Sequence, residues 1–369
     1  MKTIPILERY TSDPRTIFLA EALKNDEAAR IHLRGLAGSA SALVGTAVFS
    51  IIKGIQVFIL PDKETAAYFS NDLESLLGEA GEVFHKKLVL FYPTSYKRPY
   101  EIEKVDNTNV LLRTEVLKRL GASPKPAVVV TYPEALSEKV VSHGYLKKHT
   151  LRLRKGEAVS IDFIYDLLEE YSFTRCDFVA EPGEFSVRGG IIDVFSFTND
   201  YPYRVEFSGD EVESIRSFDP STQLSIDKLD HITILPNVQD HMHRESRETF
   251  LDYIPKTSIL WFAGALFTLD KLDQEYAKAE KAYALLNGEI AHLTPSELFT
   301  SRDIFARQML SFPLVETGSQ SLFPQAREIV FNTSPQPVFN KHFDLLLGNL
   351  AENAITRLRT LSWPIARNR

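Results

Sequence analysis

Residues 55–60 read IQVFIL, a nearly unbroken run of apolar side chains. A run of this length without polar alternation is typical of a strand that is covered on both faces. Two other runs have the same character, LVLFY at residues 88–92 and AVVVT at residues 127–131. Such strands belong to parallel sheets, because crossover helices cover both faces of those sheets.

Helical patterns separate these runs. Asp62 is the expected N-cap of a helix that ends at Gly78, and residues 109–120 form another helical stretch. Upstream, residues 31–33 form a short strand that leads through a Gly/Ser turn into a helix of small residues at 40–52. Alternating strands and helices with short links predict a parallel α/β sheet with right-handed crossovers.

The pattern changes after residue 146. Residues 150–154 (TLRLR) alternate with period two, and a helical stretch follows at 160–171. Several short strands then alternate with turn signals such as Gly189-Gly190. This texture predicts a small α+β domain with an open antiparallel sheet. Beyond it, we expect another strand at 258–262 and a long helix at 266–286.

The composition limits the class of protein. The chain has 369 residues, a net charge of −7 and 44% hydrophobic residues, which suits a soluble protein of several domains without a uniformly basic surface. Cys176 is its single cysteine, so no internal disulfide can form, and a reducing compartment is favoured. No signal-peptide core follows Met1, and residues 36–52 are too short and too rich in Gly, Ala and Ser for a membrane helix. We expect a cytoplasmic protein.

The turn after the first strand is where an NTPase would bind phosphate. Residues 35–42 read GLAGSASA and keep two glycines of the phosphate-binding pattern, Gly35 and Gly38. Ser41 stands where the pattern has lysine, and Ala42 stands where it has the magnesium-binding hydroxyl. The loop alone leaves two interpretations open, an ordinary strand-to-helix turn or a degenerate nucleotide loop. Under both, we expect no nucleotide hydrolysis.

Other chemical sites find little support. His241 and His243 have no third ligand within sequence reach, so we interpret them as exposed histidines on a linker at 239–245 rather than a metal site. We find no catalytic residues, and the acidic pairs fit turns and helix surfaces.

Residues 173–223 hold the most informative pattern. In EFSVR (184–188) alternation turns Phe185 and Val187 to one face and Arg188 to the other. In YRVEF (203–207) the outward residues are Arg204 and Glu206. If the outer faces coincide, Arg175, Arg188 and Arg204 project from one open sheet face and suit an anionic partner. Cross-strand Arg–Glu pairs on a wet surface are the alternative.

The same segment resembles the second domain shared by the repair protein UvrB and the transcription-repair coupling factors (Mfd). The resemblance rests on PGEFSVRGGIIDVF at 182–195 and on YRVEFSGDEVESIRSFDPSTQ at 203–223. It extends to PVFNKHFD at 337–344, which is similar to the end of the UvrB-like N-terminal module in the coupling factors. Residues 91–107 leave little room for the long aromatic hairpin of UvrB, which favours the coupling factors.

The resemblance implies an organisation and a site. The fold would be α/β, a degenerate P-loop-NTPase-like parallel-sheet domain with an inserted α+β antiparallel-sheet domain. Its parts would be residues 1–145 (NTPase-like), 146–237 (inserted docking domain), 238–346 (segment packing back on the first domain) and 347–369 (a tail unlike the family and expected to be disordered). The implied contacts with the repair protein UvrA are Arg175 and Arg188, supported by Phe185, Asp193, Arg204 and Glu206. Ser186 replaces a basic residue of UvrB, so that contact is not carried over.

The resemblance also implies a role. Coupling factors recruit UvrA to RNA polymerase stalled at DNA damage, and ATP, magnesium and double-stranded DNA are needed by their motor domains, which have no counterpart in this sequence. We therefore expect a docking module without catalysis, cofactor or metal. The alternative is an ATP-dependent, DNA-binding repair protein of the UvrB type.

Overall fold

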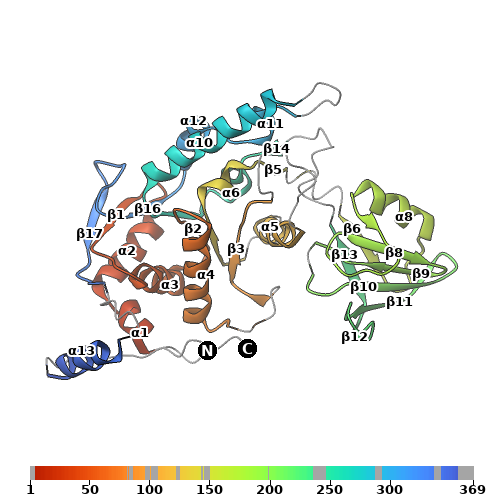
Figure 1. The fold of residues 1–369 in the computed structure, drawn as a ribbon, viewed down its shortest axis with the longest axis horizontal. Coiled ribbons are helices and arrows are strands. Elements are labelled where there is room, and N and C mark those ends of the chain that lie inside the picture. The colour runs from red at the N-terminus through yellow and green to blue at the C-terminus, as the bar shows by residue number, and fades with distance from the viewer. Residues whose placement is uncertain are drawn as a thin grey trace.

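The computed structural model describes residues 5–80, 82, 86–95, 100, 107–121, 125–142, 144, 150–197, 199–235, 247–286, 293–335 and 342–355. These residues form two units, an α/β unit and a smaller unit built mainly of strands (Figure 1). The linker at 239–245, His241, His243, the connection at 101–106 and the tail from 356 lie outside the described residues.

The α/β unit is organised around a seven-stranded sheet in which every pairing is parallel. This confirms the predicted α/β class and the parallel sheet. In spatial order the strands are β17 (Arg327–Val330), β1 (Arg30–Arg34), β16 (Leu314–Thr317), β15 (Ile259–Phe262), β2 (Ile55–Ile59), β4 (Ala127–Thr131) and β3 (Val89–Phe91).

The helices of this unit follow the expected capping chemistry. Asp62 caps α4 by accepting a hydrogen bond from the Thr65 amide at 2.8 Å, and Gly78 ends the helix with a φ of +73°, as predicted. The helices are α1 (Pro5–Thr11), α2 (Pro14–Asn25), α3 (Ala40–Ile52), α4 (Lys63–Leu77), α5 (Asn107–Leu120), α6 (Pro133–Ser137), α9 (Phe250–Tyr253), α10 (Ala265–Ala284), α11 (Pro295–Leu298), α12 (Arg302–Met309) and α13 (Phe343–Ile355).

The sheet is completed by residues far along the chain. β15 and β16 lie between β1 and β2, and β17 forms an edge beside β1. The segment after residue 247 therefore supplies internal strands of the sheet, rather than only covering faces and edges. The smaller unit is an insertion between β4 and β15. Two short antiparallel ribbons carry the chain out and back, β5 (Val140–Val141) with β14 (Arg247–Glu248) and β6 (Leu151–Arg154) with β13 (His231–Ile234).

The smaller unit holds a six-stranded sheet with helix α8 (Ile161–Glu170) against one face (Figure 1). Ile164 and Leu168 of α8 are fully buried. All neighbouring strands are antiparallel except β7 and β8, which pair in parallel. The prediction of a purely antiparallel sheet is therefore wrong for this edge. The order is β12 (Ser225–Leu229), β11 (Glu211–Phe218), β10 (Tyr203–Ser208), β9 (Ile191–Val194), β8 (Glu184–Arg188) and β7 (Thr174–Arg175).

The tail was predicted to be disordered from residue 347, but α13 continues to Ile355. Its leucine- and alanine-rich sequence favours a helix, although none of its residues is buried. Residues 347–355 are therefore helical. Among the residues that the structure describes, no helix is long and apolar enough to cross a membrane.

A buried ion pair anchors the segment that follows β3. The Arg113 guanidinium is fully buried, with Nη2 at 3.2 Å from Glu138 Oε2 and Nη1 donating to the Pro93 carbonyl at 2.7 Å. The amide and hydroxyl of Ser95 donate to the same carboxylate at 2.9 and 2.7 Å. Burial raises the pKa of the Glu138 carboxyl, and the Arg113 charge opposes that rise. The backbone at 93–95 is fixed where the chain leaves the sheet.

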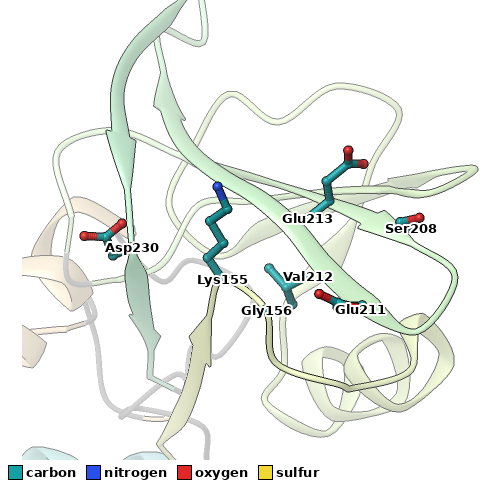
Figure 2. A pocket seen from close by; sticks show the side chains of 7 residues that line it. All are labelled: Lys155, Gly156, Ser208, Glu211, Val212, Glu213 and Asp230. Carbon is teal, nitrogen blue, oxygen red and sulfur yellow. The ribbon is translucent and has the colours of Figure 1, made fainter.

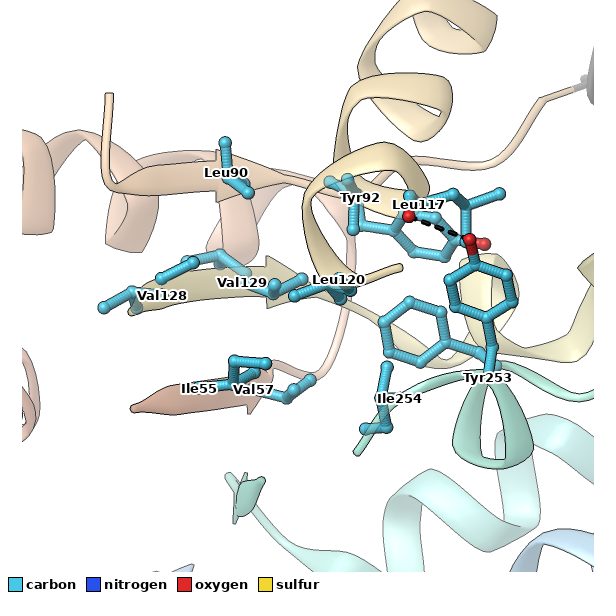
Figure 3. Packing of buried hydrophobic residues seen from close by; sticks show 14 of the residues in the cluster. Ile55, Val57, Leu90, Tyr92, Leu117, Leu120, Val128, Val129, Tyr253 and Ile254 are labelled. Carbon is cyan, nitrogen blue, oxygen red and sulfur yellow. Dashed lines mark hydrogen bonds between the residues drawn. The ribbon is translucent and has the colours of Figure 1, made fainter. Parts of the chain in front are cut away.

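The returning segment is tied to α5 by one buried hydrogen bond. The Tyr253 hydroxyl of α9 donates to the Leu117 carbonyl at 2.8 Å, within a cluster that includes Tyr92 and Leu120 (Figure 3). The ring of Phe250, also on α9, lies 4.6 Å from that of Tyr92. The hydrogen bond joins residues 136 positions apart in sequence.

We expect Tyr253→Phe to lower the free energy of unfolding by about 1–2 kcal/mol, because the buried hydrogen bond from the Tyr253 hydroxyl to the Leu117 carbonyl is lost. The measurement is urea unfolding followed by circular dichroism. Tyr68→Phe is the matched control, because Tyr68 on α4 is 69% exposed and its hydroxyl should matter by less than about 0.5 kcal/mol. Equal midpoints for the two variants would show that the Tyr253 bond does not hold the segment.

Candidate functional site

The loop between β1 and α3 is hydrogen-bonded to the segment that follows β17. Gly35 and Gly38 both have positive φ, +74° and +55°. The Ala37 amide donates to the Thr333 hydroxyl at 2.7 Å, and that hydroxyl donates to the Gly35 carbonyl at 2.8 Å. A loop amide that would be available to a phosphate is thus occupied by the segment that follows β17.

The side chains of residues 39, 41 and 42 also offer no cationic group to a phosphate. The Ser39 hydroxyl donates to Asp72 Oδ2 at 2.7 Å, which places a carboxylate beside the start of α3. Ser41 is half-buried and has no cationic group, and the methyl group of Ala42 is fully buried. A carboxylate near a helix N-terminus repels a phosphate that the helix would otherwise attract. The Thr333 and Asp72 contacts therefore oppose phosphate binding at this loop.

We expect Gly35→Ala to destabilise the chain by at least about 2 kcal/mol more than Gly38→Ala. A Cβ at Gly35 would lie 1.8 Å from the Phe331 carbonyl oxygen, whereas a Cβ at Gly38 meets nothing within 4 Å. Both variants carry the left-handed penalty of roughly 1–2 kcal/mol, so their difference reports the contact with residue 331. Urea denaturation of the two variants measures it, and matching losses would contradict the close approach.

The exposed face of the inserted unit gathers polar residues by strand register. Ser186 on β8 lies opposite Asp193 on β9, and Asp193 lies opposite Arg204 on β10. Directly opposite residues share a face of the sheet, so these side chains lie side by side. Arg188, two positions after Ser186, lies on the same face. The opposite face carries Phe185 and packs against α8.

Asp193 is the centre of this face. Its carboxylate is 1% exposed and accepts hydrogen bonds from Nε and Nη2 of Arg204 at 2.6 and 2.7 Å, and from Nη2 of Arg188. Hydrogen bonding to Asp193 raises the pKa of Arg204 above its ordinary value. One buried carboxylate therefore fixes two guanidinium groups, which is the charge-assisted, fork-like pairing that arginine geometry favours.

The two arginines differ in exposure. Arg204 is 15% exposed, because its guanidinium lies over the Phe218 ring at 4.4 Å and donates to Gln223 Oε1 at 3.0 Å. Arg188 is 41% exposed and lies over the Phe178 ring at 5.1 Å, and Phe178 is itself 65% exposed. Arg188 and Phe178 thus offer a cationic and an aromatic surface side by side, while Arg204 is largely internal. The expectation of an open sheet face is therefore wrong for Arg204, which Phe218 and Gln223 cover.

Glu206 binds one further arginine, Arg216, on the same face. It forms an ion pair with Arg216 of β11, and it accepts a hydrogen bond from the Ser214 hydroxyl at 2.5 Å. Phe178 and Arg216 are site residues that were not predicted from the sequence. The period-two pattern of residues 211–218 carries a signal for Arg216, because it turns Arg216 away from the buried Ile215. Phe178 lies in a loop, where no periodicity applies.

Arg175 lies on the other face of the sheet. It pairs with Phe185 in the parallel ladder, and its guanidinium lies over the Tyr165 ring of α8 at 5.4 Å. The predicted cluster of three arginines on one face is therefore wrong for Arg175. The physical reason is the parallel pairing of the two-residue edge strand β7, which alternation within β8 and β10 does not reveal. Phe185 is fully buried with its ring 5.6 Å from Tyr165, so it supports the sheet from below.

An open groove of about 700 Å³ lies at the β10–β11 turn (Figure 2). Its charged lining mixes Lys155 with Glu211, Glu213 and Asp230. The Lys155 and Gly156 amides already donate to the carbonyls of Asp230 and Val212, at 3.0 and 2.8 Å. In the described ranges, no cluster of three or more metal-ligating side chains occurs. Because these two amides are already bonded and the charged lining is mainly acidic, the arginine face, which carries Arg188, Asp193 and Arg204, is the stronger candidate.

Comparison with known proteins points to the part of the chain that carries the arginine face. Residues 151–239 match the family described as the UvrB interaction domain. The chain is 30% identical over 260 residues to the transcription-repair-coupling factor of Bacillus subtilis, covering 70% of this chain and 20% of that protein. The coupling factor of Myxococcus xanthus is 31% identical over 207 residues (56% of this chain, 17% of that protein), and that of Escherichia coli is 26% identical over 201 residues (54% and 17%).

These matches confirm the resemblance to the transcription-repair-coupling factors. The chain spans about a fifth of the length of the curated coupling factors that it matches. The UvrB interaction domain match coincides with the inserted unit, from the first residue of β6 past the end of β13. The arginine face, which includes Arg188, Asp193 and Arg204, lies wholly within it.

Proposed function

We propose that this chain is a non-catalytic docking module that recruits UvrA in transcription-coupled nucleotide excision repair. In the longer coupling factor it brings UvrA to RNA polymerase stalled at damaged double-stranded DNA in the cytoplasm. The observation that carries the proposal is the Asp193-centred arginine pair on an exposed sheet face, inside the part of the chain that matches the UvrB interaction domain.

The chemistry of this face fits a protein partner with carboxylates. Arg188 is exposed yet held in one orientation by Asp193 and Phe178, so little side-chain entropy is lost when it binds. Arginine and aromatic residues are the side chains that most often dominate protein interfaces. Asp193, Arg204 and Phe185 act from beneath as supports, and Glu206 lies at the margin. Arg175 joins the interface where the partner covers the β7 edge.

The rival function, an ATP-dependent DNA-binding protein of the UvrB type, has less support. The Thr333 hydroxyl occupies a loop amide, and Asp72 places a negative charge at the start of α3. We propose that the chain binds no nucleotide and needs no cofactor or metal of its own. ATP and magnesium serve the motor domains of the longer proteins.

We expect the chain to bind UvrA, and Arg188→Ala to weaken that binding by about thirtyfold, which corresponds to about 2 kcal/mol for an interface anchor. Isothermal titration calorimetry measures the affinity, and circular dichroism checks the fold. Arg152→Ala is the matched control, because Arg152 is exposed on β6, which pairs with β13 outside the six-stranded sheet. Equal affinities for the two variants would remove Arg188 from the site, and no binding by the unmodified chain would defeat the docking proposal.

We expect millimolar Mg-ATP to leave the melting temperature unchanged. A nucleotide present at about 100 times its dissociation constant adds roughly 2.7 kcal/mol to stability, which a thermal-shift measurement readily detects. Magnesium chloride without nucleotide, at the same ionic strength, is the control. A rise in melting temperature specific to Mg-ATP would overturn the proposal that the loop is inactive.

A further inference from the structure

Basic residues continue beyond Arg204 on the arginine face, which we propose as the docking face. The register places Arg216 of β11 directly opposite Arg204, and Lys228 of β12 directly opposite Arg216. Three basic side chains therefore lie in one row across three neighbouring strands. Like charges directly opposite each other destabilise a sheet, so this row is not what strand pairing alone favours.

The carboxylates that contact the row neutralise its positive charge only in part. Asp193 binds Arg204, and Glu206 binds Arg216. For Lys228, the described part of the chain provides no carboxylate within ion-pair distance, and its side chain is exposed. Arg216 is also incompletely satisfied, because its buried Nε has no hydrogen-bond partner among the described residues. The row thus keeps unbalanced positive charge at Lys228, its outer end.

We propose that the docking face continues past Arg204 and that Arg216 and Lys228 bind acidic groups of UvrA. This inference rests on the proposed function and extends its site. It is carried by the continuity of the row with the Asp193-centred pair and by its unbalanced positive charge. Arg216 is the inner contact, held in place by Glu206, and Lys228 on the edge strand β12 lies at the rim.

The alternative role of Lys228 is protection of the sheet edge. Lysine on an exposed edge strand is a common means of blocking edge-to-edge association. The two roles differ in what they predict. A docking lysine changes the affinity for an acidic partner and its dependence on salt, whereas a protective lysine changes only self-association.

The experiment measures binding of UvrA to the full chain by surface plasmon resonance at about 0.1 M and about 0.5 M salt, where the Debye length falls from roughly 10 Å to under 5 Å. The variants are Lys228→Glu and Arg216→Gln. Lys155→Glu is the matched control, because it makes the same charge change at an exposed lysine of the same unit, in the groove at the β10–β11 turn. Circular dichroism confirms that each variant is folded.

We expect Lys228→Glu to raise the dissociation constant about tenfold more than Lys155→Glu at low salt, mainly through slower association, and the difference to shrink at high salt. Arg216→Gln should raise it by at least about tenfold, mainly through faster dissociation. If the unmodified chain binds but Lys228→Glu matches Lys155→Glu and Arg216→Gln is unchanged, the extension is wrong and the docking proposal stands. If the unmodified chain does not bind, both proposals fail.

Discussion

The order of strands in the seven-stranded sheet is the constraint on which the rest of the structure depends. β15 and β16 lie between β1 and β2, so the core is complete only when residues beyond 247 have returned to the first part of the chain. The inserted unit is therefore held at both ends, by the β5–β14 and β6–β13 ribbons. A unit tied at two points has fewer orientations available to it than one on a single linker.

Within the inserted unit, Asp193 is the residue on which the proposed docking face depends. An unpaired buried carboxylate would be strongly unfavourable, but its oxygens accept three hydrogen bonds from two arginines. The two arginines that these bonds hold differ in how far their guanidinium groups are covered. Arg204 is covered by Phe218 and Gln223, whereas Arg188 keeps an open surface beside Phe178. Removal of the carboxylate would therefore disturb both guanidinium groups together.

The sequence alone predicted local features well and long-range ones poorly. Continuous apolar runs identified β2 and β4, and the chemistry of Asp62 and Gly78 located both ends of α4, because capping and burial on both faces leave marks within a few residues. The faces of Arg188 and Arg204 followed from alternation. The face of Arg175 did not, because it depends on which strand β7 pairs with and in which direction. The Ala37–Thr333 bond joins residues 296 positions apart and leaves no local pattern.

The closure of the loop follows from the completion of the sheet. β17 pairs with β1, and the chain that leaves β17 passes the loop so closely that residue 35 must be glycine. Thr333 then reaches the amide of Ala37. A bound phosphate would need that amide, so the segment that completes the sheet edge competes with nucleotide for the same donor. The proposal that the loop binds no nucleotide therefore rests on Ser41 and Ala42, which supply neither a cation nor a magnesium-binding hydroxyl, and on the contact with Thr333. The proposed docking face, which carries Arg188, Asp193 and Arg204, shares no residue with this loop, so the docking proposal does not depend on what the loop binds.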